Sequence, residues 1–427
     1  MKWETIKSII LIFLIGVSLV LSFVLWNFQP KYGTLQSKYV SEVDLGGIET
    51  TKRAVIKPKA IIFHKDKIFY RFHNINDEVE YFEAMFDWDF SDITFEAPKR
   101  WDLFNEMVEI QFPLPIQASL LQNIFTVEKP EQLPNWSFQK ILIKPNKQLL
   151  TLEVYFVSPN GEQSFRMSVN NSEIYMDVTA PFSREHHLAK QIQLQTGNDS
   201  FYLPEKSVNL PRRSLAIEYI EPSLLVNALF RNPSLVSHTI GETNYNDGQR
   251  MMEVLNDGRS MEFTNPIEIS EHLSFSDMLN TTIEHINEHK GWTNNFILDE
   301  LDTHTNRIQF KMSYGGYPVI SHEDYSMIEQ RWAGQDLYQY KRPLFKLTNL
   351  LNSEEVSLPS GLEIVEYLSE NENYNLDQIN DIRLAYRLIY EEGSFSVRLE
   401  PTWYLKYNER WTELILEPIK VLDKEGV

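Results

Sequence analysis

The sequence His285-Ile286-Asn287-Glu288-His289 has the residue types and spacing best suited to chemistry. It fits the H-x-x-E-H pattern of one group of zinc peptidases. Residues four apart share a helix face, so both imidazoles would reach one zinc ion, but a catalytic zinc also needs a third protein ligand. No third ligand is apparent nearby, and both histidines flank the apolar stripe of the helix. We therefore interpret His285 and His289 as residues at the rim of a packed helix.

Two further polar clusters are weaker candidates. The sequence Glu185-His186-His187 places neighbouring side chains in different directions, which favours an exposed loop over a metal site. Asp87, Asp89 and Asp92 alternate with aromatic residues, which is more typical of the exposed face of a strand or turn than of a glycosidase carboxylate pair. No nucleophile elbow, Walker phosphate loop or dinucleotide-binding glycine pattern occurs in the sequence. The sequence predicts no enzyme, no cofactor and no metal site.

The composition excludes several other classes of protein. The chain of 427 residues contains no cysteine, which rules out disulfides, thiol nucleophiles and thiolate metal sites. It carries 60 acidic and 40 basic side chains, so the formal net charge is −20 at pH 7. Such a surface repels phosphate backbones, and nucleic acid is therefore not an expected partner. Hydrophobic residues make up 42% of the chain, which is enough for sizeable buried cores.

Residues 8–30 carry no charged side chain and are mostly apolar. About 20 apolar helical residues cross a hydrocarbon layer roughly 30 Å thick, so this segment is long enough to span a membrane. A secretory signal peptide has a shorter apolar stretch and small residues at its cleavage site, which are missing here. We expect a cytoplasmic tail over 1–7 and a transmembrane helix over 8–29. Because large domains tend to translocate whatever their charge, we place the rest outside the cell membrane.

One face of this predicted helix is suited to contact with another helix. Ser18 and Ser22 are four residues apart and form a narrow face together with Ile15. Small residues at this spacing let two membrane helices approach closely. The same pair also fits chance occurrence, since serine is tolerated in membrane helices. If the face is used, the anchor is an interaction surface as well as an attachment.

Beyond the predicted anchor, the sequence predicts an α+β fold in which antiparallel sheets with packed helices form several domains. We place an N-terminal extracytoplasmic domain at 30–208, a middle domain at 209–292 and a C-terminal domain at 293–427. The first boundary lies within the proline-containing linker 204–213. There a mostly strand-like pattern gives way to mixed strands and helices.

Local signals predict the individual elements. In the first domain we expect a hairpin over 60–72 turning at Lys65-Asp66, a helix over 101–109 and long loops around Pro113, Pro115, Pro130 and Pro134. Asp-Gly and Asn-Gly sequences favour tight turns and helical caps mark helix starts. The other expected elements are a hairpin around Pro159-Asn160-Gly161, a helix over 222–230, a three-strand meander over 244–265, a helix over 274–290, strands over 307–313 and 332–340, a turn at Gly315-Gly316, a capped helix starting at 360–363 and a closing hairpin over 382–399.

Several short sequences, in this order and together with the apolar segment, resemble the YycH family. They are Leu25-Trp26-Asn27-Phe28-Gln29-Pro30, Val55-Ile56-Lys57-Pro58 with His64, Asn244-Tyr245-Asn246-Asp247-Gly248-Gln249-Arg250, Glu262-Phe263-Thr264-Asn265-Pro266, Gly316-Tyr317-Pro318-Val319, Tyr340-Lys341-Arg342-Pro343, Leu358-Pro359-Ser360-Gly361 and Leu399-Glu400-Pro401-Thr402-Trp403-Tyr404.

The resemblance implies a bitopic accessory protein of the WalK/WalR (YycG/YycF) two-component system, which controls cell-wall metabolism in low-GC Gram-positive bacteria. It implies three extracytoplasmic domains, of which the C-terminal one is YycI-like, and no enzymatic activity. It also implies two protein partners, a YycI-type accessory protein and the sensor histidine kinase WalK, contacted through membrane helices. The lipid bilayer would be a further partner of the N-terminal helix. The sign of the regulation is not implied.

Two alternatives belong to other functional classes. One is an anchored cell-wall hydrolase, zinc-dependent through His285 and His289 or otherwise. The other is a membrane-tethered module that binds a wall polymer.

Overall fold

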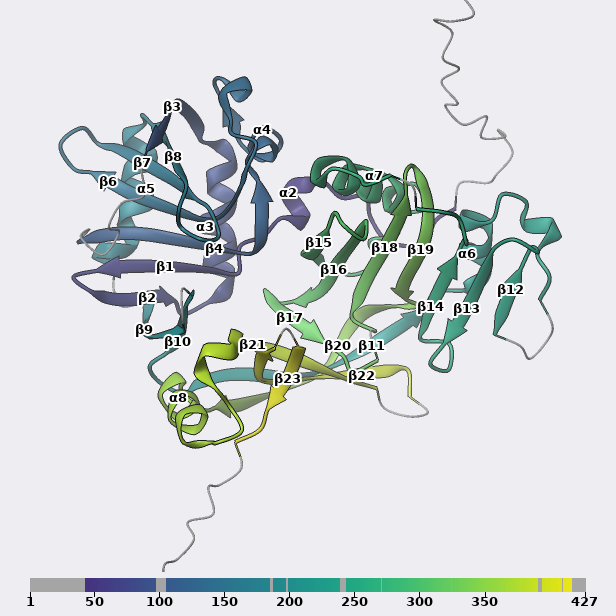
Figure 1. The fold of residues 1–427 in the computed structure, drawn as a ribbon. Coiled ribbons are helices and arrows are strands. Elements are labelled where there is room, and N and C mark those ends of the chain that lie inside the picture. The colour runs from purple at the N-terminus through teal and green to yellow at the C-terminus, as the bar shows by residue number, and fades with distance from the viewer. Residues whose placement is uncertain are drawn as a thin grey trace, which may run out of the picture. The chain divides into compact units, whose positions relative to one another are not determined.

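The computed structural model describes residues 43–96, 105–184, 187–196, 199–238, 243–269, 271–323, 325–390, 394–408 and 410–416. The predicted transmembrane helix over 8–29, with Ile15, Ser18 and Ser22, lies outside the described residues. Among the helices that the structure does describe, none has the length and apolar character needed to cross a bilayer. The described chain forms two β-sheets with helices packed on them (Figure 1), which confirms the expected mixture of sheets and helices.

The first sheet contains ten described strands in the order β10-β9-β2-β1-β4-β6-β7-β8-β3-β5. Neighbouring strands are antiparallel except for β3 and β5, which are parallel. The strands are β1 (Ala60–Lys65), β2 (Ile68–Phe72), β3 (Asp89–Glu96), β4 (Glu106–Gln117), β5 (Thr126–Val127), β6 (Ser137–Asn146), β7 (Thr151–Val157), β8 (Ser164–Val169), β9 (Leu188–Thr196) and β10 (Asp199–Pro204). The associated helices are α2 (Lys52–Val55), α3 (Ile75–Ala84), α4 (Leu121–Ile124) and α5 (Ser172–Ser183), with 3₁₀ turns at Met85–Asp87, Ala118–Leu120 and Pro130–Gln132.

The prediction of a helix over 101–109 is wrong for the residues that the structure describes. Glu106–Gln117 forms β4, which lies between β1 and β6, and its residues 107–112 are all buried. Val108, Ile110, Phe112, Leu114 and Ile116 alternate with polar residues and prolines, so this stretch carries the period-two pattern of a strand, which the helix prediction overlooked.

The predicted long loop around Pro113 and Pro115 is also wrong. Both prolines lie within β4, where the register with β6 shifts between Gln111 and Ile116. Proline has no backbone N–H to donate, so it is tolerated in a stretch of strand that does not pair regularly.

The second sheet is built from later residues. Its described strands follow the order β12-β13-β14-β19-β18-β16-β17-β21-β22-β11-β20, with β15 paired to β16 and β23 paired to β22. The strands are β11 (Val208–Tyr219), β12 (Asn244–Asn246), β13 (Met251–Leu255), β14 (Ser260–Thr264), β15 (Phe296–Asp302), β16 (Arg307–Tyr314), β17 (Tyr317–Ile320), β18 (Met327–Ala333), β19 (Asp336–Pro343), β20 (Phe345–Leu358), β21 (Ile379–Tyr390), β22 (Ser396–Tyr407) and β23 (Arg410–Leu414). Its helices are α6 (Pro222–Leu229), α7 (Phe275–Asn287) and α8 (Gly361–Glu370), with 3₁₀ turns at Pro233–Leu235 and Leu376–Gln378.

Most of the elements predicted for this part are confirmed, because each is set by local chemistry. The Ser274 side chain accepts a hydrogen bond from the Asp277 amide and caps α7, and Ser360 and Glu363 form a capping box at the start of α8. The predicted single strand over 332–340 is wrong. It contains the turn at Gly334, whose φ is +59°, and this turn joins β18 to β19.

The sheets divide the chain at the segment between β10 and β11, because strands up to β10 belong to the first sheet and β11 belongs to the second. Within the second sheet, β14 pairs with β19. Strands from the predicted middle and C-terminal domains therefore share one sheet. The division into three domains stays a prediction.

Helix α8 packs closely on β10 of the first sheet. A Cβ atom added to Gly361 would lie 2.5 Å from the Leu203 Cβ and 2.8 Å from the Pro204 carbonyl oxygen. Around this contact, Leu203 and Phe201 share a buried cluster with Ile364. The two sheets are therefore held together by direct apolar packing.

We expect the substitution Gly361→Ala to lower the free energy of unfolding by about 1–3 kcal/mol, because the added methyl group overpacks this contact. Denaturant unfolding monitored by circular dichroism measures the change. Glu366→Ala, on the exposed face of the same helix, is the matched control and should have little effect. Equal effects of the two substitutions would contradict the close contact between α8 and β10.

Candidate functional site

The first described segment of the chain binds the C-terminal end of α7. The Leu45 amide donates to the His289 carbonyl at 3.1 Å, and the Gly47 amide donates to the Lys290 carbonyl at 3.1 Å. Ile48 then forms a single antiparallel bridge with Trp292. We call residues 44–50 the strap.

Side chains hold the strap from both sides. The Asn287 side chain exchanges two hydrogen bonds with the Thr50 backbone, at 2.9 and 3.0 Å. Asp44 pairs with Lys290 at 2.7 Å. A Cβ atom added to Gly47 would lie 2.5 Å from the Lys290 carbonyl oxygen, so only glycine permits this approach. The strap is therefore packed closely against the C-terminal end of α7.

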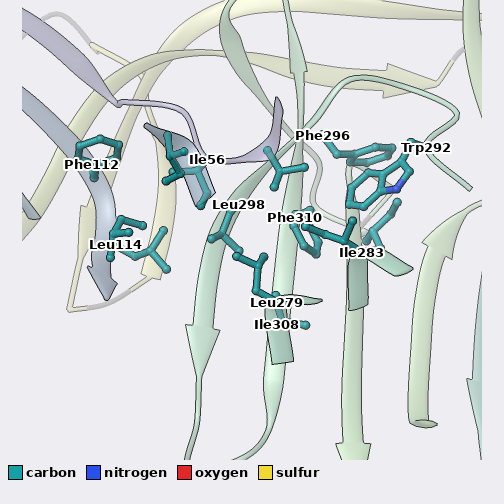
Figure 2. Packing of buried hydrophobic residues seen from close by; sticks show 14 of the residues in the cluster. Ile56, Phe112, Leu114, Leu279, Ile283, Trp292, Phe296, Leu298, Ile308 and Phe310 are labelled. Carbon is teal, nitrogen blue, oxygen red and sulfur yellow. The ribbon is translucent and has the colours of Figure 1, made fainter. Parts of the chain in front are cut away.

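After the strap, the chain passes between the two sheets. Val55 and Ile56 are buried and belong to the main apolar cluster. Figure 2 shows Ile56 with Phe112 on one side and Leu298 on the other. Phe112 belongs to β4 of the first sheet and Leu298 belongs to β15 of the second. One apolar core therefore joins the sheets along the path of the chain.

A buried polar cluster lies beneath the strap. His289 is 3% exposed, and its Nε2 lies 3.2 Å from the Tyr340 hydroxyl. The Arg342 guanidinium donates to the same hydroxyl at 3.2 Å, and within the described residues no carboxylate pairs with Arg342. The His285 Nδ1 lies 2.9 Å from the Gln330 amide nitrogen.

This environment keeps both imidazoles neutral. Burial lowers the pKa of His285 to about 4. Burial also lowers the pKa of His289 well below its usual value, and His285 and the Arg342 charge lower it further. The predicted position at the helix rim is wrong for His289, because β19 packs beneath that edge of α7 and covers the side chain.

The geometry around the H-x-x-E-H sequence does not suit a metal ion. Within the described residues, no three His, Cys, Asp or Glu side chains are grouped closely enough to hold a metal ion. Glu288 is exposed, and the charge of the Arg342 guanidinium acts on the His289 imidazole. A guanidinium repels a divalent cation at short range.

The other clusters singled out in the sequence also lack catalytic geometry. Asp87, Asp89 and Asp92 are all exposed, as expected for the outer face of a strand or turn. Of the Glu185-His186-His187 sequence, the first two residues lie outside the described residues and His187 is exposed.

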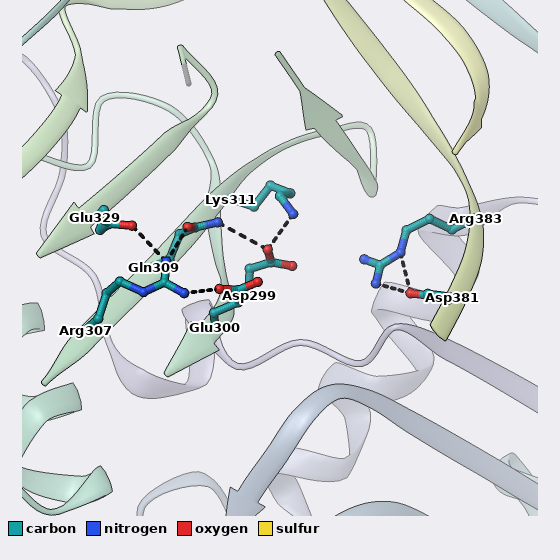
Figure 3. A network of polar contacts seen from close by, with 8 residues as sticks. All are labelled: Asp299, Glu300, Arg307, Gln309, Lys311, Glu329, Asp381 and Arg383. Carbon is teal, nitrogen blue, oxygen red and sulfur yellow. Dashed lines mark hydrogen bonds and ion pairs between the residues drawn. The ribbon is translucent and has the colours of Figure 1, made fainter. Parts of the chain in front are cut away.

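Charged side chains that the sequence did not single out meet between the sheets. Asp381 of β21 is 4% exposed, and it pairs with Lys59 at 2.5 Å and with Arg383. Nearby, Lys311 pairs with Asp299 at 2.5 Å. Figure 3 shows Arg383 on Asp381 and Lys311 on Asp299. Lys59 precedes β1, so its pair with Asp381 links the two sheets electrostatically.

These ion pairs keep the Asp381 carboxylate ionised. Burial alone would raise the pKa of Asp381, but the charges of Arg383 and Lys59 outweigh it and lower the pKa to about 2. The Trp411 ring covers the Arg383 guanidinium, whose Cζ lies 4.5 Å from the ring centroid. A carboxylate that is paired with two cations and stays ionised does not act as a proton-transfer group near neutral pH. Its role is structural.

A second buried carboxylate organises the first sheet. Glu109 accepts from Gln111 at 2.8 Å and from the Tyr202 hydroxyl at 3.0 Å, and it lies 2.9 Å from the His64 Nε2. Burial would raise the pKa of Glu109, but His64, Lys140 and Gln111 lower it to about 2. Glu109 lies in the segment predicted as a helix, and a helix would not bring it to these cross-strand partners.

Two protein-family models match this chain. The model described as "YycH protein, N-terminal domain" matches residues 4–182, and the model described as "YycH protein, C-terminal domain" matches residues 198–418. The chain belongs to the YycH family. The resemblance found in the sequence is thereby confirmed.

A relative and a solved structure, both described as YycH of Bacillus subtilis, are similar to most of this chain. "Two-component system WalR/WalK regulatory protein YycH" of Bacillus subtilis (strain 168) is 25% identical over 458 aligned residues, covering 100% of this chain and 99% of that protein. The solved "Crystal Structure of YycH from Bacillus subtilis" matches with a TM-score of 0.72 at 22% identity, covering 86% of this chain and 98% of that chain. This structural match shows that the YycH fold is shared.

Proposed function

We propose that this YycH-family chain regulates the sensor histidine kinase of a WalR/WalK two-component system, as a membrane-anchored accessory protein without enzymatic activity. The observation that carries the proposal is the full-length similarity to a B. subtilis protein described as a WalR/WalK regulator. The site chemistry supports it, because the buried carboxylates Glu109 and Asp381 are paired with cations and the His285 and His289 imidazoles are held neutral.

The proposed location follows from the uncharged segment at 8–29. It attaches the chain to the cell membrane as a single-pass helix, with the N-terminus in the cytoplasm and the bulk of the chain outside. The proposed partners are the kinase WalK and a YycI-type accessory protein. The lipid bilayer surrounds the anchor.

The proposed contact with the kinase uses the membrane face of Ile15, Ser18 and Ser22. Interhelical hydrogen bonds in membranes contribute about 0.6 kcal/mol each and at most about 1.7 kcal/mol. If the contacts of the two serines differ between two states of the kinase, they shift the equilibrium between these states. Their contribution is too small to fix the kinase in one state.

The strap attaches the first described residues of the chain to the end of α7. Residues 44–50 follow the anchor in sequence and bind the end of α7 through backbone hydrogen bonds and the Asp44–Lys290 pair. A change at this end of α7 would therefore act on the chain segment that leads towards the anchor.

Replacing both Ser18 and Ser22 with Leu is expected to reduce co-purification of the kinase several-fold, because the bulkier side chains prevent close helix approach. The matched control places two leucines on the opposite face, at Val20 and Val24, which lie about 200° around the helix from Ser18 and Ser22 respectively. Quantitative capture from solubilised membranes measures both variants. Equal capture of the kinase by both would remove this face from the proposal.

A further inference from the structure

A cleft lies between the two sheets among the described residues. Its volume is about 670 Å³, and its walls come from β2, β9 and β10 on one side and from β17, β21 and β22 on the other. A neighbouring cleft of about 480 Å³ shares Lys59, Gln111 and Arg383 with it, so the space continues along the interface. Small-molecule and peptide sites commonly have this size and lie between structural units.

One polar group on the wall of the cleft lacks a partner. Gln191 of β9 is 5% exposed, and its Nε2 donates to the Ala189 carbonyl at 3.0 Å. Its Oε1 has no hydrogen-bond partner within the described part of the chain. Buried amide groups are nearly always hydrogen-bonded, so this position is suited to a ligand that carries an N–H group. A peptide backbone supplies such N–H groups, one of which would donate to the Gln191 Oε1.

One exposed lysine supplies an unpaired positive charge at the cleft. Six lysine and arginine side chains line the cleft. Five of them are already neutralised by ion pairs with described carboxylates: Lys57, Lys59, Arg71, Lys190 and Arg383. Lys206 is exposed at the cleft, and it forms no ion pair with any residue that the structure describes.

The remaining wall is largely aromatic and apolar. Phe72, Phe201, Tyr317 and Trp403 line the cleft. Such rings pack on the aliphatic parts of a peptide, while a free ammonium at the rim pairs with a carboxylate. Because Lys59 joins the sheets on one wall and α8 joins them through Gly361, the cleft is preformed and loses little ordering entropy on binding.

We propose that the inter-sheet cleft is a binding site for a short peptide that carries carboxylate groups, with a ligand amide on Gln191 and a ligand carboxylate on Lys206. This inference goes beyond the proposed kinase regulation and does not depend on the membrane anchor. Such a peptide reaches the cleft either as a free fragment with its own terminal carboxylate or as a segment of another protein.

The experiment is calorimetric titration of the full-length chain in detergent with a hexapeptide of alternating alanine and glutamate. The same peptide with an amidated C-terminus separates a free fragment from an internal segment, because only a fragment needs the terminal carboxylate. The neutral peptide with glutamine in place of glutamate is expected to bind about tenfold more weakly or worse. Tri-N-acetylchitotriose is the uncharged sugar control and is expected not to bind.

Two variants test the named contacts. Gln191→Leu and Lys206→Glu are each expected to weaken binding about tenfold, whereas Lys129→Glu, an exposed lysine outside the cleft, should leave it unchanged. Gln191→Leu removes the unpartnered Oε1 together with the Nε2 hydrogen bond to the Ala189 carbonyl, so a melting curve checks that this variant is folded before its affinity is compared. Absence of saturable binding of the acidic peptide, equal affinity of Gln191→Leu and the unchanged chain, or binding of the sugar instead would each overturn the proposal.

Discussion

Replacing Asp381 with Asn is expected to lower the free energy of unfolding by about 3–5 kcal/mol. The substitution keeps the shape of the side chain but leaves Lys59 and Arg383 without their shared counter-charge between the sheets. Desolvated cations that lose their partner carry the full cost of desolvation, which is much larger than the net contribution of an exposed pair. Equilibrium unfolding in denaturant at neutral pH measures the difference.

An exposed ion pair is the control for this effect. Glu354 is 62% exposed and pairs with Arg212 at 3.0 Å, so Glu354→Gln should cost less than about 1 kcal/mol. The pH dependence gives a second check. The pKa of Asp381 is lowered in the folded state, so its contribution is present above pH 4 and is lost as pH falls towards about 2. A cost for Asp381→Asn no larger than that for Glu354→Gln would contradict the proposed role of this pair.

Acidification from pH 6.5 to about 4 is expected to destabilise the protein through His285 and His289. Both imidazoles have lowered pKa values in the folded state, so the unfolded chain binds protons first as pH falls. Stability is therefore complete above about pH 6.5 and is lost below it, by at most about 1.4 kcal/mol per pH unit for each histidine. For His285, whose folded pKa is about 4, the loss reaches about 3 kcal/mol.

Melting temperatures measured across this pH range test the expectation. His285→Gln and His289→Gln should each flatten the dependence between pH 6.5 and 4, whereas the exposed control His322→Gln should leave it unchanged. The losses due to Glu109 and Asp381 begin below about pH 4.5, so the two contributions separate. Stability that is constant from pH 6.5 to 4 would show that the buried histidines do not disfavour protonation.

Local sequence predicted the elements whose ends are set by neighbouring residues. The turn of the first hairpin falls at Asp66 and Lys67, both with positive φ, within one residue of the predicted position. Helices α7 and α8 begin at their predicted caps, Ser274 and Ser360. The helix predicted over 101–109 was wrong because it ended at Glu109 and passed over the alternation of apolar residues from Val108 to Ile116. The place of Pro113 and Pro115 within a strand depends on the irregular pairing of β4 with β6, which no local pattern reports.

The contacts of the candidate site were harder to predict from the sequence than the fold. The H-x-x-E-H spacing was visible, but the Arg342 side chain that opposes a metal ion comes from β19. The pair of Lys59 and Asp381 and the cleft around Gln191 depend on contacts between the two sheets, and no local pattern reports them. A buried carboxylate within an apolar strand, as at Glu109, was the one available signal of a paired interior charge.

The most direct test of the proposed function is site-specific crosslinking in intact membranes. A photo-reactive amino acid placed at position 18 or 22 of the full-length chain reports which proteins lie beside the predicted anchor. We expect a crosslink to the sensor kinase from these two positions and a much weaker one from positions 20 and 24. Recovery of the chain outside the membrane fraction, or no kinase crosslink from any of the four positions, would contradict it.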